Sequence, residues 1–261
     1  MIPRDYITEW RNQAPWVDDA QVEQDLVICR ALTGIFSNKI LHDALAFRGG
    51  TALFKLHLPA ARYSEDIDLV QVKATFAGPI MGALREVLNP WLGKPNFKHT
   101  KAGITFRYRF QSEDGQPLRL KVEINTREHF AVAGFKDVPF TVDSRWHTGS
   151  CSILSYELNE LLGTKLRALY QRKKGRDLFD LAIALDVKDA NPEKIIAVFY
   201  AYMQHGGHMV TKKQFEDNIA AKLQDNNFAS DIGPLLAADY EWDLKSMSEK
   251  VNDTLISLLT D

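Results

Sequence analysis

Two consecutive segments near the middle of the chain alternate between apolar and polar residues. The apolar positions are Ile104, Phe106, Tyr108 and Phe110 in the first segment and Leu118, Leu120, Val122 and Ile124 in the second. A period of two places such residues on one face of a β-strand. The turn residues Glu113-Asp114-Gly115 between the segments predict a strand pair joined by a tight connection. The polar face of the second strand then carries Glu123 among basic residues.

Shorter patterns predict the elements that come before this pair. A strand over residues 44–47 is expected to run into Gly49-Gly50, followed by a helix that Thr51 caps and Pro59 ends. A second strand is expected over residues 66–72. Helical spacing of apolar residues predicts further helices over residues 17–45 and over residues 76–92, the latter interrupted near Pro79.

The pattern becomes helical from about residue 155. Helices are predicted over residues 155–172, 177–185, 191–206, 211–224 and 242–259. The sequence therefore predicts an α+β protein with two domains. Residues 1–150 are expected to form a mixed sheet flanked by helices, and residues 151–261 a C-terminal helical bundle.

Strand periodicity also gives the first indication of chemistry. Asp66 and Asp68 lie two residues apart on a predicted strand and therefore point to the same side, while Ile67 and Leu69 point into a core. The Gly49-Gly50 turn exposes backbone N–H groups just before them. Two converging carboxylates beside such a turn suit a divalent metal that carries a polyphosphate.

Composition narrows the possible functions. The chain has 261 residues, of which 45% are hydrophobic and 25% charged, and this favours a packed globular protein. The formal net charge of −2 means that binding of a nucleic acid requires a local basic patch. Cys29 and Cys151 lack metal-ligand spacing, and neither a signal peptide nor a membrane span is recognisable, so a cytoplasmic protein without a membrane partner is expected.

Other catalytic motifs are missing from the sequence. It contains neither a Gly-x-Ser-x-Gly element nor a Walker-type Gly-Lys-Ser/Thr loop, and its histidines are scattered. Hydrolase and P-loop interpretations therefore have no support. What remains is a glycine turn, an Asp-x-Asp strand and a third acid, Glu123, on a later strand. Two-metal nucleotidyl transfer uses this arrangement, with carboxylates that hold the two ions together.

Three segments carry a family resemblance. They are Phe47-Arg48-Gly49-Gly50-Thr51-Ala52-Leu53, Arg62-Tyr63-Ser64-Glu65-Asp66-Ile67-Asp68-Leu69, and a helical stretch from Glu157 to Leu169 that continues through Arg172 to Leu181. With them the sequence resembles the polymerase-β-like nucleotidyltransferase superfamily, and within it the AbiEii/AbiGii (MenT-like) toxins of type IV toxin–antitoxin systems. Each motif is common by itself, and their joint order is what indicates the family.

The resemblance implies roles for the site residues. Gly49, Gly50 and Thr51 would cradle the phosphates of a nucleoside triphosphate (NTP). Asp66 and Asp68 would bind Mg²⁺, as one ion or two and with Mn²⁺ as a substitute. Strand parity makes Glu123 the natural candidate for the third carboxylate, and the sequence leaves open whether it is a metal ligand. Lys165 would reach the triphosphate from the second domain. Asp177, together with Arg176, would close the active-site cleft from the helical side.

Ser64 lies two residues before Asp66, at the mouth of the expected metal site. A phosphate on Ser64 would place about two negative charges beside the metal ligands and compete with the triphosphate. The resemblance implies such silencing for some toxins of the group, and it implies a cognate antitoxin as partner. The alternative interpretation is purely structural: Ser64 only ends a loop before the strand.

The acceptor of the nucleotide is the least constrained part of the prediction. Basic residues are expected on the exposed face of the sheet and along the helical side, namely Arg107, Arg109, Arg119, Lys121, Arg167, Arg172, Lys173, Lys174 and Arg176. Together with the resemblance they favour transfer to the 3′ end of tRNA, which would block translation in a toxin–antitoxin or phage-defence system. The alternatives are a small-molecule or protein hydroxyl as acceptor, and a catalytically silent nucleotide-binding module.

Overall fold

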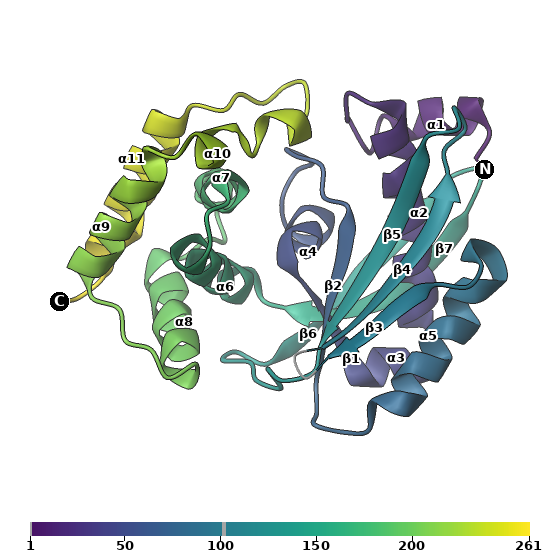
Figure 1. The fold of residues 1–261 in the computed structure, drawn as a ribbon, viewed down its shortest axis with the longest axis horizontal. Coiled ribbons are helices and arrows are strands. Elements are labelled where there is room, and N and C mark those ends of the chain that lie inside the picture. The colour runs from purple at the N-terminus through teal and green to yellow at the C-terminus, as the bar shows by residue number, and fades with distance from the viewer. Residues whose placement is uncertain (1, 101–102) are drawn as a thin grey trace. The chain divides into compact units, whose positions relative to one another are not determined.

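The computed structural model describes residues 2–100 and 103–261 of the chain. These form two compact units, one ending at Tyr156 and one running from Glu157 to Asp261. The ribbon in Figure 1 labels the helices and strands of each unit. The predicted domain boundary near residue 150 falls within strand β7 (Thr148–Tyr156).

A mixed β-sheet forms the centre of the first unit (Figure 1). Its described strands are β1 (Leu45–Arg48), β2 (Asp66–Gln71), β3 (Asn96–Thr100), β4 (Gly103–Gln111), β5 (Pro117–Asn125), β6 (Phe135–Asp143) and β7. Across the sheet they follow the order β3-β4-β5-β2-β1-β7-β6. β2 pairs in parallel with β5 and antiparallel with β1, and β1 pairs in parallel with β7. The site-bearing strand β2 is therefore central, with the β5 strand directly beside it.

One face of this sheet is apolar, and its register explains why. Ile67 of β2 lies opposite Val122 of β5, which lies opposite Phe106 of β4, and all three side chains are fully buried. Helices α2 (Asp19–Ser37) and α5 (Ala77–Leu92) pack here, since Phe36 contacts Phe47 and the Arg85 guanidinium lies over the Phe106 ring. The alternate positions of β2 and β5 consequently point to the other face.

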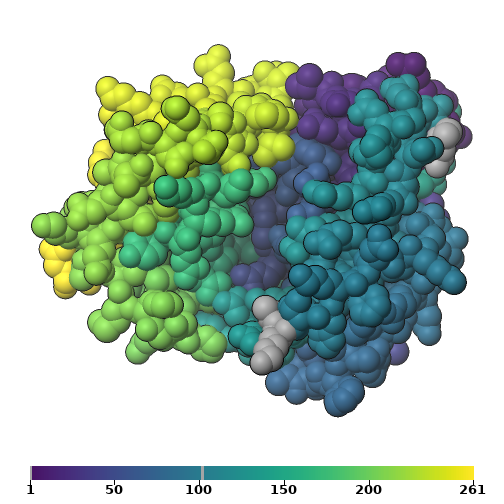
Figure 2. Space-filling model, in the orientation of Figure 1, coloured from purple at the N-terminus to yellow at the C-terminus, as the bar shows by residue number. Residues whose placement is uncertain are grey.

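The remaining helices of the first unit are short. They are α1 (Arg4–Trp10), α3 (Lys39–Ala44) and α4 (Gly49–Leu56). Helix α4 follows β1 without any intervening loop and contacts both β1 and β2. In the space-filling view of Figure 2, blue to teal residues from α5 to β5 form most of the visible surface of this unit.

The elements of the second unit are helical. They are α6 (Leu158–Gln171), α7 (Gly175–Ala184), α8 (Pro192–His205), α9 (Lys212–Leu223), α10 (Asn226–Ser230), α11 (Leu244–Thr254) and the short 3₁₀ turns η1 (Gly233–Leu235) and η2 (Ile256–Leu258). Helix α6 packs closely on α8 because Gly163 has no side chain. A Cβ added there would lie 2.4 Å from Val198 Cγ1. The apolar stripe that predicted α6 is buried, and its residues Leu162 and Leu166 are fully buried.

The structure confirms the predicted fold class and corrects several details. Thr51 does not cap α4, because the helix already begins at Gly49. Pro79 does not interrupt α5, since it lies in the first turn, where no intrahelical N–H bond is required. Strands β3, β6 and β7 were not predicted, and residues 155 and 156 belong to β7 rather than to α6. β3 is exposed along its whole length, so it carries no apolar alternation.

Candidate active site

The glycine pair at the start of α4 permits a close approach of two side chains. Gly49 has a φ of +81°, which favours glycine, and a Cβ added to it would lie 2.4 Å from Asp68 Oδ2. A Cβ on Gly50 would lie 2.5 Å from a nitrogen of Arg62. The first N–H groups of α4 lack intrahelical partners, as at every helix start. The turn therefore brings an anion-binding helix end next to a carboxylate.

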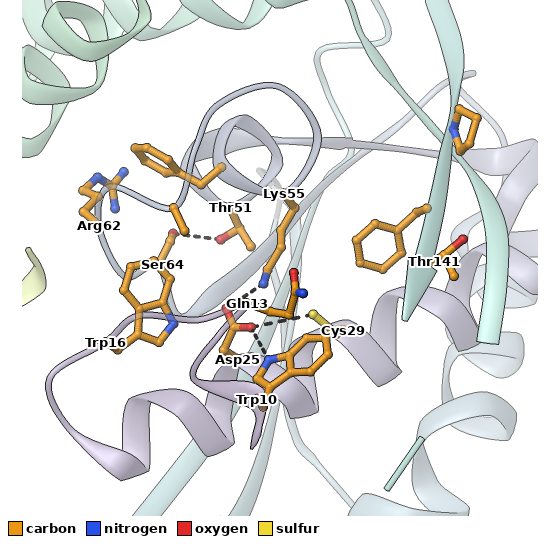
Figure 3. Close-up of a pocket in the computed structure, with 14 residues that line it drawn as sticks. Trp10, Gln13, Trp16, Asp25, Cys29, Thr51, Lys55, Arg62, Ser64 and Thr141 are labelled. Carbon is orange, nitrogen blue, oxygen red and sulfur yellow. Dashed lines mark hydrogen bonds and ion pairs between the residues drawn. The ribbon is translucent and has the colours of Figure 1, made fainter. Parts of the chain in front are cut away.

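Thr51 fastens this turn to the start of β2. Its hydroxyl donates to the Asp66 carbonyl oxygen at 2.5 Å and lies 2.8 Å from the Ser64 hydroxyl oxygen. Because the carbonyl can only accept, Ser64 donates to Thr51 in this pair. Ser64 is thus held beside the glycine turn, two residues before the first acid of β2 (Figure 3).

The register of β2 and β5 brings the three predicted acids together on one face. Asp66 lies opposite Lys121, and Asp68 lies opposite Glu123. Residues directly opposite one another share a face, so the three carboxylates surround one stretch of two neighbouring strands. Thr105 on β4 donates to Glu123 at 3.3 Å and helps to orient it. Strand parity in the sequence had predicted this common face.

A cation that the sequence analysis had not assigned to this group lies among the acids. Lys121 Nζ is 2.6 Å from Asp66 Oδ2 and 3.0 Å from Glu123 Oε2. On the other side of β2, Arg48 lies opposite Asp68 and forms an ion pair with Glu128 at 2.8 Å. Strand parity could have placed Lys121 on the acidic face, but its contacts with two carboxylates depend on the pairing of β2 with β5.

The carboxylates repel one another despite Lys121. Burial raises the pKa of Asp68, the negative charges of Asp66 and Glu123 raise it further, and Arg48 and Lys121 oppose the shift. A bound cation at this position would relieve the repulsion. The group therefore favours additional positive charge near Asp68.

The chemistry of the donors fits Mg²⁺. Carboxylate oxygens are the ligands that hard divalent cations prefer. Within residues 2–100 and 103–261 no group of three or more Asp, Glu, His or Cys side chains is arranged so that it could hold a metal ion. The Lys121 ammonium pairs with both Asp66 and Glu123 and so supplies a cation between these two acids.

A cavity of about 310 Å³ lies beyond the Thr51–Ser64 pair (Figure 3). At its floor Asp25 accepts from Lys55 at 2.6 Å and from the Trp10 indole at 2.9 Å. The Asp25–Lys55 pair ties α2 to α4, the helix that starts at the glycine turn. This pair was not predicted from the sequence, although polar residues within an apolar helical pattern are a usable signal.

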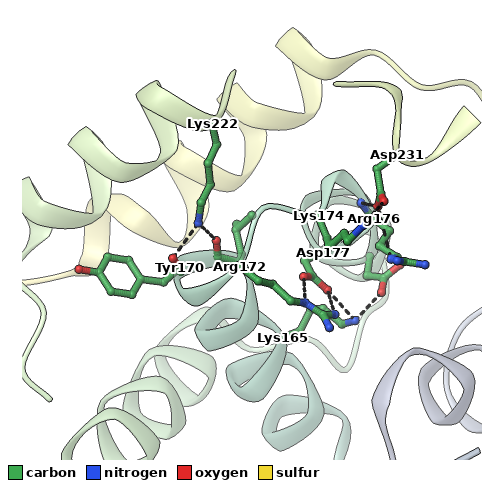
Figure 4. Close-up of polar contacts among 10 residues, drawn as sticks. Lys165, Tyr170, Arg172, Lys174, Arg176, Asp177, Lys222 and Asp231 are labelled. Atoms are coloured by element: carbon green, nitrogen blue, oxygen red, sulfur yellow. Dashed lines mark hydrogen bonds and ion pairs between the residues drawn. The ribbon is translucent and has the colours of Figure 1, made fainter. Parts of the chain in front are cut away.

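Two of the predicted residues of the second unit, Lys165 and Asp177, lie in a buried charge cluster of that unit (Figure 4). Lys165 Nζ is 3.1 Å from Asp177 Oδ1 and 2.8 Å from Asp180 Oδ2, and both aspartate side chains are fully buried. Arg172 donates to both oxygens of Asp177, at 2.6 and 2.8 Å. Burial by itself raises the pKa of Asp177, but Lys165 and Arg172 more than offset this and hold it at about 2.

Arg176 differs from the predicted arrangement. It pairs with Asp231, at 3.3 Å, whereas Arg172 is the arginine that pairs with Asp177. Asp180 had not been predicted, although its position one helical turn after Asp177 was a signal. The structure thus gathers Gly49, Gly50, Thr51, Ser64, Asp66, Asp68 and Glu123 in the first unit. It gathers Lys165 and Asp177 in the second.

The fold and this site define a class of protein. MenT4, a nucleotidyltransferase toxin from Mycobacterium tuberculosis H37Rv, superimposes with a TM-score of 0.69 at 15% identity, over 99% of this chain and 91% of that one. A putative nucleotidyltransferase from H. pylori superimposes with a TM-score of 0.58 at 16% identity, over 93% of this chain and 95% of that one. The chain therefore has a nucleotidyltransferase fold.

A family model makes the assignment narrower. The model described as "Nucleotidyl transferase AbiEii toxin, Type IV TA system" matches residues 30–250, so the chain belongs to this family of nucleotidyltransferase toxins. This confirms the resemblance found in the sequence. No curated protein matches the chain. Among its described helices, none is both long enough and apolar enough to cross a membrane.

Proposed function

We propose that this protein transfers a nucleotide from an NTP to an RNA acceptor, the 3′ end of tRNA, in an Mg²⁺-dependent reaction. The observation that carries the proposal is the common face of Asp66, Asp68 and Glu123 directly beside the glycine turn of α4. Membership of a nucleotidyltransferase toxin family supports the reaction class. The resulting block of translation would explain toxicity.

Each group of the site has a part in this reaction. The N–H groups at the start of α4 hold the phosphates, with Gly49, Gly50 and Thr51 allowing them to approach. Asp66, Asp68 and Glu123 would hold Mg²⁺, which would supply Lewis-acid stabilisation of negative charge when bound. The 3′ hydroxyl loses its proton to water and its oxygen forms a bond to the α-phosphorus, while the bond from that phosphorus to the oxygen bridging to the β-phosphate breaks and pyrophosphate leaves.

The residues of the second unit complete the proposal. Lys165 would neutralise negative charge on the triphosphate, and Asp177 would position Lys165 through their 3.1 Å contact. Arg176 would contact the nucleotide as an additional cation. For the acceptor, Arg107, Arg109 and Arg119 are available on the polar face of β4 and β5, since they share the parity of Lys121. Such cations bind an RNA backbone with an affinity that falls as salt rises.

The proposed function also includes regulation by an antitoxin and a cellular role. The family assignment implies an antitoxin partner. Ser64, held by Thr51 next to the acids, is the hydroxyl at which a phosphate would compete with the triphosphate. We assign the protein to the cytoplasm, where its NTP and tRNA substrates are found, and to a defence role against phage.

Incubation of the purified protein with total RNA, Mg²⁺ and each of the four labelled NTPs tests the proposal. We expect label at the 3′ end of tRNA with at least one NTP, and a loss of about 10³-fold or more with Asp66→Asn. Asp114→Asn, in the exposed turn between β4 and β5, is the matched control and should retain full activity. Label on a protein or on a small molecule would show that the acceptor is not RNA. If the folded protein transfers no nucleotide from any NTP, the proposed enzymatic activity is contradicted.

A further inference from the structure

Lys121 contacts proposed metal ligands on both β2 and β5. Its ammonium contacts Asp66 on β2 at 2.6 Å and Glu123 on its own strand at 3.0 Å. Its side chain is 20% exposed, so it is enclosed by the acids and not extended into solvent. The lysine thus provides the positive charge that balances part of the acidic face.

An ammonium in this position and a divalent cation exclude one another. Both would take the same carboxylate lone pairs, and two cations this close repel strongly. With all groups ionised, the three carboxylates and Lys121 leave a formal charge of −2. Release of the ammonium gives the acids a larger negative charge for metal binding. It also leaves a lysine without its partners.

We propose that Lys121 is a counter-cation that holds the acids together until Mg²⁺ displaces it, and that its released ammonium then binds the phosphates of the incoming NTP. This inference rests on the proposed function. The four-carbon stem of lysine is flexible enough for such a shift. The destination is close, because a Cβ added to Gly49, at the start of α4, would lie 2.4 Å from Asp68 Oδ2 on the neighbouring strand.

The exchange couples the two ligands. When the metal binds alone, it must displace the ammonium from two carboxylates, and the ammonium gains no new anionic partner. Metal binding without nucleotide is therefore weakened. The triphosphate supplies the ammonium with a new anionic partner, so nucleotide strengthens metal binding and metal strengthens nucleotide binding. The site would consequently stay in its Lys121-paired form until metal and NTP arrive together.

Mn²⁺ binding, followed by the electron paramagnetic resonance signal of free Mn²⁺, tests this coupling without any turnover. It is measured for the wild type and for Lys121→Met, with and without each of the four α,β-methylene nucleoside triphosphates. We expect Lys121→Met to bind Mn²⁺ alone at least about tenfold more tightly than the wild type. We also expect the variant to lose most of the enhancement that the nucleotide gives.

Lys98→Met is the matched control. Lys98 lies on β3 opposite Thr105, which in turn lies opposite Glu123, so it is an exposed lysine on the same face, two strands from the acids. Its removal changes the net charge by the same amount but breaks no contact with Asp66 or Glu123. Wild-type Mn²⁺ affinity in this variant would show that local contact, rather than overall charge, determines the effect.

A second measurement uses the wild-type protein and does not depend on whether a variant folds. Lysines are labelled with an amine-reactive reagent and quantified by peptide mass spectrometry. We expect saturating Mg²⁺ to raise the labelling of Lys121 several-fold and the further addition of the nucleotide analogue to lower it again. Labelling of Lys98 should not change.

The outcomes separate this inference from the proposed function. Unchanged or weaker Mn²⁺ binding by Lys121→Met, or Lys121 labelling that ignores Mg²⁺, would overturn the role of Lys121. If instead Asp66→Asn binds Mn²⁺ as the wild type does, the acids are not a metal site, and the proposed function itself is contradicted.

Discussion

At the scale of single residues, the site depends on the absence of a side chain at Gly49. Its positive φ and the 2.4 Å that would separate an added Cβ from Asp68 Oδ2 make two separate demands for glycine. Alanine at this position should strain the backbone and push the carboxylate out of line with Asp66. The conformation of the turn and the position of the Asp68 carboxylate therefore depend on the same residue, Gly49.

We predict that Gly49→Ala lowers nucleotidyl transfer by about 10²-fold or more and destabilises the first unit by about 1–3 kcal/mol. Gly115→Ala is the matched control, because Gly115 has a φ of +77° but nothing within 4 Å of its added Cβ. Gly115→Ala should lower stability through backbone strain but retain full transfer activity. Steady-state transfer rates and urea unfolding check both. Equal activity of the two variants would contradict the close approach to Asp68 as the cause.

At the scale of elements, helix pairs are set by small residues as much as by large ones. Gly163 lets α6 approach α8 so closely that an added Cβ would meet Val198 Cγ1 at 2.4 Å and the Ile195 carbonyl oxygen at 2.9 Å. The same helix carries Lys165 two residues further on. The spacing of α6 and α8 thus helps to fix the helix on which the buried lysine is placed.

We predict that Gly163→Ala destabilises the second unit by about 1–3 kcal/mol, because overpacking outweighs the better helix propensity of alanine. Gly82→Ala in α5 provides the contrast. Gly82 also lies inside a helix, but nothing lies within 4 Å of its added Cβ, so alanine should stabilise by about 0.5–1 kcal/mol. Hydrogen exchange of peptides from α6 and α5 measures each effect separately. Stabilisation by Gly163→Ala would show that the close packing of α6 on α8 is not rigid.

At the scale of the whole molecule, two compact units depend on different kinds of interaction. The first unit is organised around an apolar sheet face, whereas the second buries the charges of Lys165, Asp177 and Asp180, and the exposed Arg172 pairs with Asp177. Burying such a cluster costs desolvation free energy, which only its complete pairing repays. The second unit should therefore respond strongly to anything that removes one of these charges.

Acid should reveal this dependence. The pKa of Asp177, about 2, lies below its ordinary value of 3.8, so the unfolded chain binds a proton at higher pH than the folded one. The resulting stabilisation, about 2 kcal/mol, is complete above about pH 4 and is lost as the pH falls from about 4 to about 2. Hydrogen exchange of α7 peptides across this range measures it. Asp177→Asn should be less stable at neutral pH, with a flatter acid dependence. The same acid slope in both would contradict the assignment to Asp177.

Much of the fold and part of the site could be predicted from the sequence because they follow from periodicity. Alternation in β2, β4 and β5 placed Asp66, Asp68 and Glu123 on polar faces, and apolar helical spacing predicted α6 to α9. The edge strand β3 was not predicted because it is exposed along its whole length and no apolar residue repeats along it. The start of α4 was misplaced because the positive φ of Gly49 goes with its close approach to Asp68, which is distant in sequence.

The sequence by itself determined which residues alternate, which helices have an apolar stripe, and the order of the motifs that place the chain in its family. Those properties are local, since each depends on residues a few positions apart. Only the tertiary structure decided which charges meet: Lys121 with Asp66, Arg172 rather than Arg176 with Asp177, and Asp25 with Lys55. Such pairs form between elements, and electrostatic attraction acts through the distance in space that the packing of those elements creates.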